Sequence, residues 1–329
     1  DLLYSRGNTH SILKNYPETI RDCTRLLQIQ PDYPYARGVL VHSKLQCCDW
    51  TGLDDQQREI SLGIAGGKRV VSPFNHKALS DSPEEQLQCA SNWVRHECPP
   101  TRPLWQGESY KHDRIRLAYL SADLNNTAVA TLMAGVFEHH NRTRFAPIAV
   151  SFGPDSPTPM RARLIAAFEA FHDVREKSDQ DIAIQLHALG IDIAVDLMGF
   201  TGACRPRIFA ARPAPVQVNF VGFPGTMGAS YMDYILADRI VIPAADATYY
   251  SEKIVYLPDC YQPNDDKRRV ADKVPTRSEA GLPEQGFVFC CFNNSYKIMP
   301  DVFDVWMRLL RATPGSVLWL LAEIGRAHV

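Results

Sequence analysis

Short apolar runs alternate with amphipathic segments along the chain from residue 114 onward. Each run has the length of a buried strand, which predicts strands over residues 115–120, 145–150, 191–197 and 216–221. Pro147 favours an edge or irregular position for the second strand, because proline cannot donate a hydrogen bond to a sheet ladder. Short apolar strands that alternate with helices predict a parallel, doubly wound sheet.

The segments between these strands have helical spacing. One helix carries an apolar face made of Leu132, Met133, Val136 and Phe137. Another begins at an N-cap, Thr158, with Pro159 at its first position. Its inward residues are predicted to be Leu164, Ile165, Phe168 and Phe171. A third helix includes Ile184 and Leu186.

A second strand–helix–strand unit opens at Phe287. Its first strand covers 287–291, its helix begins at Pro300, and its next strand covers 316–321. The apolar face of that helix consists of Val302, Phe303, Trp306, Leu309 and Leu310.

The N-terminal residues predict a pair of helices. The apolar positions of the first helix are Leu2, Leu3, Ile12 and Leu13. The second helix starts near Pro17, ends at Pro31, and has an apolar face of Ile20, Cys23, Leu26 and Leu27. Gly7, Tyr16 and Pro31 lie where a tetratricopeptide repeat has a small residue, an aromatic residue and a terminator, although Thr19 replaces the usual Ala. An ordinary helical hairpin is the alternative, and a repeat would imply further copies upstream.

The bulk properties exclude several classes of protein. The chain has 329 residues, a net charge of −2, and no apolar run of the roughly 20 residues that a membrane helix needs. We therefore expect no nucleic-acid partner and no membrane association. The nine cysteines form no C-x-x-C pair, which disfavours a disulfide framework or zinc site and favours a reducing, cytoplasmic setting.

Three polar loops follow predicted strands and are candidates for ligand binding. The first, 292–297, ends in Lys297, which can neutralise a diphosphate leaving group. The second, 222–228, carries glycines at three-residue spacing that allow close approach of a ligand to the backbone. The third, 199–205, ends in Arg205, which either contacts phosphate or simply starts a helix. Taken alone, the first two loops also fit a solvated lysine and a tight turn.

Six runs of the chain together resemble the protein O-GlcNAc transferase family, including its bacterial and SPINDLY-like members. They are residues 212–217, 222–226, 232–234, 250–253, 292–297 and 314–319. The resemblance implies tetratricopeptide repeats followed by two Rossmann-like lobes in the GT-B arrangement. It implies inverting, metal-independent transfer of GlcNAc from UDP-GlcNAc to Ser or Thr of protein acceptors, which the repeats recruit. No cofactor is expected.

The resemblance also assigns roles to residues. Lys297 is implied to meet the donor diphosphate, with Tyr296 as its catalytic neighbour. The implied substrate-binding residues are Asn294, Val221, Gly222, Pro224, Gly225, Thr226 and Thr127. Asn294 stands where the O-GlcNAc enzymes carry Gln, and it favours the SPINDLY branch, which transfers fucose. The same runs also fit a catalytically impaired scaffold protein or an epimerase that acts on nucleotide sugars.

Two departures from the family pattern affect the expected activity. Thr127 replaces the family's active-site His, and threonine cannot serve as a base near neutral pH. The second lobe is expected to be truncated, so we expect little transfer from this chain alone. The predicted parts are a repeat at 1–38, a helical linker at 39–110, the first catalytic lobe at 111–282, the start of the second lobe at 283–322, and a non-native tail at 323–329.

Overall fold

The computed structural model describes residues 2–321, and the predicted tail 323–329 lies outside the described residues. The chain packs as two compact units. Unit 1 combines residues 1–71 with residues 269–329, and unit 2 comprises residues 72–268. The domain boundaries inferred from the sequence do not refer to these packing units, and they stay a prediction.

Unit 1 begins with four helices, α1 (Leu2–Ile12), α2 (Tyr16–Ile29), α3 (Ala36–Gln46) and α4 (Leu53–Ala65). The predicted pair of N-terminal helices is confirmed. Gly7 is buried where α1 meets α2. A Cβ at this position would lie 3.5 Å from Cys23 Sγ of α2. Arg6 of α1 also pairs with the buried carboxylate of Asp22 at 2.6 Å.

Most of the apolar residues named for the first helix are exposed in the structure. Leu2, Ile12 and Leu13 are 88%, 81% and 70% exposed. The helix contact uses a small residue and an ion pair in place of these large side chains. On α2 the fully buried positions are Thr19, Asp22, Cys23 and Leu26. Ile20 and Leu27 are only half-buried.

The second part of unit 1 is a strand–helix–strand unit, as predicted. Strands β8 (Val288–Cys291) and β9 (Val317–Leu320) pair in parallel, with Val288 opposite Val317. Between them lie the 3-10 turn η2 (Ser295–Lys297) and helix α11 (Pro300–Ala312). A parallel pair requires such a crossover, and here the helix provides it.

Unit 2 contains a seven-stranded sheet that is parallel throughout. Its strand order is β3-β2-β1-β4-β5-β6-β7. The bounds of the strands are β1 (Ile115–Ser121), β2 (Phe145–Ser151), β3 (Ala170–Asp173), β4 (Ile193–Asp196), β5 (Val216–Asn219), β6 (Tyr234–Ala237) and β7 (Lys253–Tyr256). The predicted fold class, a helical N-terminal region followed by a parallel α/β sheet, is therefore confirmed.

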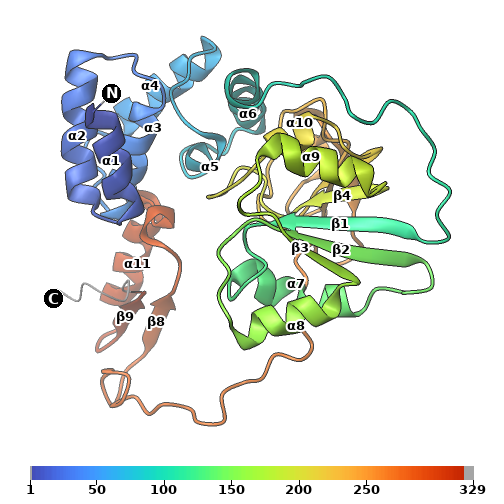
Figure 1. The fold of residues 1–329 in the computed structure, drawn as a ribbon. Helices are drawn as coiled ribbons and strands as arrows, with labels where there is room; N and C mark the ends of the chain where they lie inside the picture. The colour runs from blue at the N-terminus through green and yellow to red at the C-terminus, as the bar shows by residue number, and fades with distance from the viewer. Residues whose placement is uncertain (1, 322–329) are drawn as a thin grey trace. The chain divides into compact units, whose positions relative to one another are not determined.

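Helices cover both faces of this sheet (Figure 1). Besides its strands, unit 2 contains α5 (Pro73–His76), α6 (Pro83–Glu97), α7 (Ala128–Glu138), α8 (Pro159–Ala167), α9 (Asp179–Ala188), α10 (Arg207–Ala210) and the 3-10 turn η1 (Ala244–Tyr249). Alternate residues of β1 divide the core. Ala118 and Leu120 join the cluster that includes α9 and α10, whereas Leu117 and Tyr119 join the cluster with α7 and α8.

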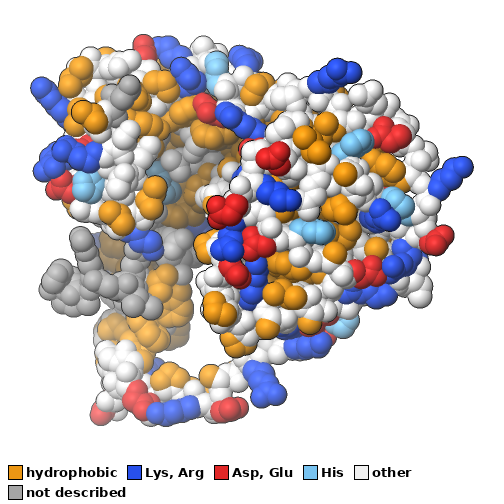
Figure 2. Space-filling model, in the orientation of Figure 1, with side chains coloured by type: hydrophobic (Ala, Val, Ile, Leu, Met, Phe, Trp, Pro, Cys, Tyr) orange, Lys and Arg blue, Asp and Glu red, His pale blue; other side chains and the backbone are white. Residues whose placement is uncertain are grey.

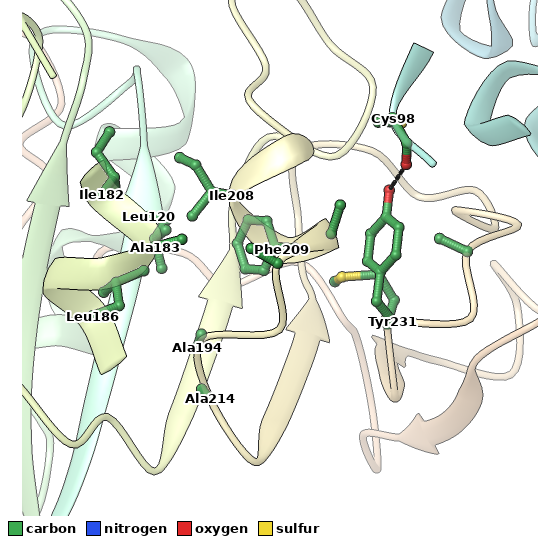
Figure 3. Packing of buried hydrophobic residues seen from close by; sticks show 14 of the residues in the cluster. Cys98, Leu120, Ile182, Ala183, Leu186, Ala194, Ile208, Phe209, Ala214 and Tyr231 are labelled. Atoms are coloured by element: carbon green, nitrogen blue, oxygen red, sulfur yellow. Dashed lines mark hydrogen bonds between the residues drawn. The ribbon is translucent and has the colours of Figure 1, made fainter. Parts of the chain in front are cut away.

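Figure 3 shows the first of these clusters, in which Ile182 and Leu186 of α9 and Phe209 of α10 gather over the sheet. Tyr231 belongs to the same cluster, and its hydroxyl donates to the carbonyl of Cys98 at 3.1 Å. That bond ties the segment after α6 to the segment before β6.

The structure corrects four details of the predicted sheet. Strand β2 is internal, and Pro147 is tolerated because the β3 register begins only at the next residue, Ile148. Helix α8 ends at Ala167, so Phe171 belongs to β3. Ile165, which was predicted to face inward, is 47% exposed. Strands β3, β6 and β7 were not predicted.

Charged side chains of both signs are interspersed on the face shown in Figure 2, in agreement with the small net charge. Within residues 2–321, no helix has the length and apolarity required to span a bilayer. The same residues contain no group of three or more His, Cys, Asp or Glu side chains with the spacing of a metal site.

Candidate functional site at the carboxyl edges of two parallel sheets

The strand order of unit 2 reverses at β1. Strand β1 lies between β2 and β4, so the connections that leave β1 and β4 run in opposite directions along the sheet. Open α/β sheets bind ligands outside the carboxyl ends of their strands at such a switch point. The loops that follow β1, β4 and β5 therefore form the first candidate site.

The loop after β5 begins with a strained turn. The N–H of Gly222 donates to the carbonyl of Phe220 at 2.9 Å, which closes a three-residue turn around Val221. Val221 has φ of +66°, a conformation that a β-branched residue rarely adopts. Strain of this kind costs about 1–3 kcal/mol and is typical of functional sites.

Glycines interlock this loop with the loop after β4. A Cβ on Gly222 would lie only 2.0 Å from the carbonyl oxygen of Leu197, so no other residue fits there. Gly199 has φ of +55°, and a Cβ on it would lie 2.4 Å from Cβ of Phe223. Gly199 and Gly222 therefore allow the loop after β4 and the loop after β5 to pack closely against each other.

Two buried polar side chains hold the rest of this loop. Asn219 donates through Nδ2 to the carbonyls of Phe223 at 3.0 Å and Gly225 at 3.3 Å. Glu252, just before β7, accepts from the N–H of Met227 at 2.6 Å and from the hydroxyl of Thr226 at 2.7 Å. Burial raises the pKa of Glu252. These bonds make the loop a rigid part of the sheet edge.

Thr226 also accepts hydrogen bonds from two backbone N–H groups, those of Ser251 at 3.1 Å and Gly228 at 3.2 Å. Its hydroxyl is buried and serves the fold. Pro224 is half-buried and Gly225 is buried in the same loop, with the side chain of Lys77 against Gly225.

Asp196 at the end of β4 is a buried carboxyl group, 3% exposed. Its Oδ1 accepts from the N–H of Met198 at 2.8 Å, and the N–H of Gly199 also points to it. Loss of hydration outweighs these two amides and raises the pKa of Asp196 to about 7. Asp196 thus sets the path of the 197–199 loop, on which Gly222 packs.

In the loop after β1, Thr127 has a structural role. Its side chain accepts from the N–H of Ala130 at 3.3 Å, as the N-cap of α7, and its hydroxyl donates to the carbonyl of Asp123 at 2.8 Å. The carboxyl group of Asp123 is half-buried, and burial raises its pKa. Within residues 2–321 it has no hydrogen-bond or ion-pair partner.

The arginine of the third predicted loop is structural. Arg205 pairs with Asp179 at 2.6 Å and donates to the carbonyl of Lys177 at 2.6 Å. Arg205 precedes α10, which begins at Arg207, and its guanidinium is engaged within the fold, which favours the structural alternative over the phosphate contact.

The second candidate site is the loop between β8 and α11 in unit 1. Lys297 closes η2, is exposed, and makes no ion pair with any described residue. Its ammonium group lies 5.9 Å from the ring centroid of Tyr296, within range of a cation–π contact. Tyr296 also receives a hydrogen bond from Asn294, and burial raises the pKa of its phenol. The N-terminus of α11 has no side-chain cap.

The structure thus groups the predicted residues by unit. Val221, Gly222, Pro224, Gly225, Thr226 and Thr127 belong to loops at one sheet edge of unit 2, and Asn294, Tyr296 and Lys297 share one loop of unit 1. Sequence reasoning gave no role to Asp123, Asp196 and Glu252. An acidic residue at the end of an apolar strand, or two residues beyond it, was the available signal for the first two.

Comparison with known proteins places this arrangement in a family. The profile of glycosyl transferase family 41 matches residues 100–273 and 266–328. The chain belongs to glycosyl transferase family 41. This confirms the resemblance inferred from the six sequence runs, and the match includes the loops after β1, β4, β5 and β8.

Relatives of known name agree with this assignment. The chain is 35% identical, over 86% of its length, to a probable UDP-N-acetylglucosamine–peptide N-acetylglucosaminyltransferase SEC of Arabidopsis thaliana, of which it spans 31%. It is 30% identical, over 69% of its length, to the similarly named SPINDLY of Arabidopsis thaliana, of which it spans 25%. The chain therefore spans about a third or less of these curated relatives.

A solved structure is also similar. A mutant O-GlcNAc transferase of Thermobaculum terrenum matches with a TM-score of 0.72 and 26% identity, over 97% of this chain and 61% of that one. The fold of this chain is therefore similar to that of the solved enzyme over nearly its whole length.

Proposed function

We propose that this chain is part of a protein O-glycosyltransferase that transfers GlcNAc from UDP-GlcNAc to Ser or Thr hydroxyls with inversion. One observation carries the proposal: Lys297 is an exposed cation without an ion-pair partner among the described residues, between the end of β8 and an uncapped helix N-terminus. The family match and the names of the relatives support the same reaction class.

The reaction makes one bond and breaks one bond. The acceptor oxygen attacks the anomeric carbon, the bond from that carbon to the diphosphate breaks, and UDP leaves with the bonding electrons. Lys297 and the backbone N–H groups at the start of α11 would neutralise the charge that develops on the diphosphate. Together they would provide this stabilisation without a metal ion.

The acceptor hydroxyl must also lose a proton. Thr127 cannot take it, because its hydroxyl already caps α7 and has no basic form near neutral pH. We assign this role to Asp123, whose carboxyl group is half-buried and unpaired within residues 2–321. A carboxyl pKa raised by burial makes a stronger base than an exposed carboxylate.

Two competing functions can be separated by experiment. Asn294 favours a SPINDLY-like donor preference, that is, fucose, although the SPINDLY relative is itself named for UDP-N-acetylglucosamine. The engaged hydroxyl of Thr127 favours a scaffold protein that has kept the fold without the chemistry. The proposal of a protein O-glycosyltransferase includes recruitment of protein acceptors through tetratricopeptide repeats.

The test uses the product of the complete gene with radiolabelled UDP-GlcNAc or GDP-fucose and a protein extract as acceptor. We expect label from UDP-GlcNAc on Ser and Thr, and at least a hundredfold loss of transfer in Lys297→Ala. Lys273→Ala is the matched control, because Lys273 is an exposed lysine of the same unit that pairs with Glu279.

Each outcome has a distinct meaning. Label from GDP-fucose alone would show that the donor is GDP-fucose and not UDP-GlcNAc. UDP binding without transfer would favour a scaffold protein. Conversion of free UDP-GlcNAc into another sugar nucleotide would identify an epimerase.

A further inference from the structure

The helical region of unit 1 touches the loop that carries Lys297. The indole Nε1–H of Trp50, in the segment between α3 and α4, donates to the carbonyl of Ile298 at 3.2 Å. Ile298 is the residue directly after Lys297 and caps η2. A side chain from the N-terminal helices therefore holds the backbone at the base of the predicted diphosphate lysine.

Two ring contacts reinforce this bond on either side. The ring of His42 in α3 lies 4.9 Å from the ring of Tyr296, the residue directly before Lys297. The ring of Trp50 lies 5.4 Å from that of Phe303 in the first turns of α11. Lys297 is thus the exposed member of a short turn whose neighbours on both sides are packed against helical residues.

The chemistry of these contacts suits a fixed support. Burial lowers the pKa of His42 to about 4, so its imidazole is neutral near pH 7 and does not repel the ammonium group of Lys297. A short 3-10 turn such as η2 has few internal hydrogen bonds to define it. The contacts from His42 to Tyr296 and from Trp50 to Ile298 therefore add support for its position.

We propose that Trp50 and His42 are positioning residues for the donor site: they hold η2 so that Lys297 meets the diphosphate of the nucleotide. This inference rests on the proposed function of Lys297. It gives the N-terminal helices a second role beside acceptor recruitment, because a displacement of α3 or of the α3–α4 segment would move η2 and alter donor binding.

The main test substitutes Trp50→Phe, which keeps an aromatic ring beside Phe303 and removes the indole N–H together with the five-membered ring that carries it. With the product of the complete gene, we expect the Kd for UDP and the KM for UDP-GlcNAc to rise about three- to tenfold, as for loss of one hydrogen bond. The KM for the acceptor protein should not change. Trp105→Phe is the matched control, since Trp105 in unit 2 also donates its indole N–H to a carbonyl, that of Glu108 at 2.9 Å.

A double-mutant cycle separates positioning from general stability. If Trp50 acts through Lys297, Trp50→Phe has little further effect on UDP affinity in a Lys297→Met background. Additive effects, or equal losses in Trp105→Phe, would overturn the proposal. For His42, the Ala variant should weaken UDP binding and the Phe variant should restore it, because Phe keeps the ring contact with Tyr296.

A measurement without nucleotide keeps this inference distinct from the proposed function. Amide hydrogen exchange of residues 292–299 should be faster in Trp50→Phe than in the wild type and unchanged in Trp105→Phe. If exchange rises but no nucleotide binds to any form, the proposed function fails while the support of η2 stands. Unchanged exchange in Trp50→Phe would contradict the support itself.

Discussion

Asp196 offers a test of how the first candidate site is held together. Its carboxyl group is 3% exposed, and burial outweighs two backbone N–H donors, so its pKa rises from 3.8 to about 7. A carboxyl group whose pKa is raised in the folded state binds a proton that the unfolded chain has released. The stability it contributes is complete below pH 3.8 and is lost as the pH rises toward 7.

The magnitude follows from the pH interval. Between about pH 5 and 7 the folded state keeps the proton and the unfolded state does not, which lowers the free energy of unfolding by about 1.4 kcal/mol per pH unit. Wild type should therefore lose about 3 kcal/mol more than Asp196→Asn between about pH 5 and pH 8. Asn lacks the titration but can still accept from the N–H of Met198.

The assay is urea unfolding at pH 5 and pH 8, followed by circular dichroism. Asp238→Asn is the control: backbone N–H donors lower the pKa of Asp238, so its removal leaves the difference between these two pH values as in wild type. Equal pH dependence in wild type and Asp196→Asn would refute the reasoning, and it would mean that water reaches this carboxylate in the folded protein.

Three further predictions concern the same loops. Glu252→Gln should lower the free energy of unfolding by about 2 kcal/mol in urea titrations, because the new amide N–H₂ faces donor groups of Thr226 or Met227; an unchanged midpoint would contradict the network. Thr127→Val should cost about 1 kcal/mol by the same measurement through loss of the α7 cap, and Thr127→Ser should retain it. Asp123→Asn should lower kcat about a hundredfold, with KM unchanged. In the wild type, kcat should fall as the pH drops through the raised pKa of Asp123, and the variant should lack this acid limb. A wild-type kcat in this variant would exclude Asp123 as the base.

The sequence by itself identified the elements that depend on local pattern. Continuous apolar runs located β1, β2, β4, β5, β8 and β9, since buried parallel strands need apolar side chains on both faces. The cap signal at Thr158 was also sufficient, and its side chain accepts from the N–H of Arg161 at 3.1 Å. Six motif runs in a fixed order were enough to identify the family, because each run specifies both residue type and position along the chain.

Other features depended on contacts between distant residues. Strands β6 and β7 escaped prediction although β4, β5, β8 and β9 have the same length of four residues; the parallel pairing of β5 with β6 and of β6 with β7, which defines their place in the sheet, joins separate segments of the chain. The role of Glu252 could not be read from its position, since it is defined by a loop 25 or 26 residues earlier. Arg205 and Thr127 lie in loops that are typical of binding sites in sequence. In the structure, however, Arg205 pairs with Asp179 and the hydroxyl of Thr127 donates to the carbonyl of Asp123.

The link between Trp50 and Ile298 joins residues 248 positions apart, and no local pattern encodes it. Periodicity records which side of an element is buried, because burial constrains every turn or alternate residue in the same way. It does not record which element supplies the partner. Only the tertiary structure decided that helices at the start of the chain support the loop that carries Lys297.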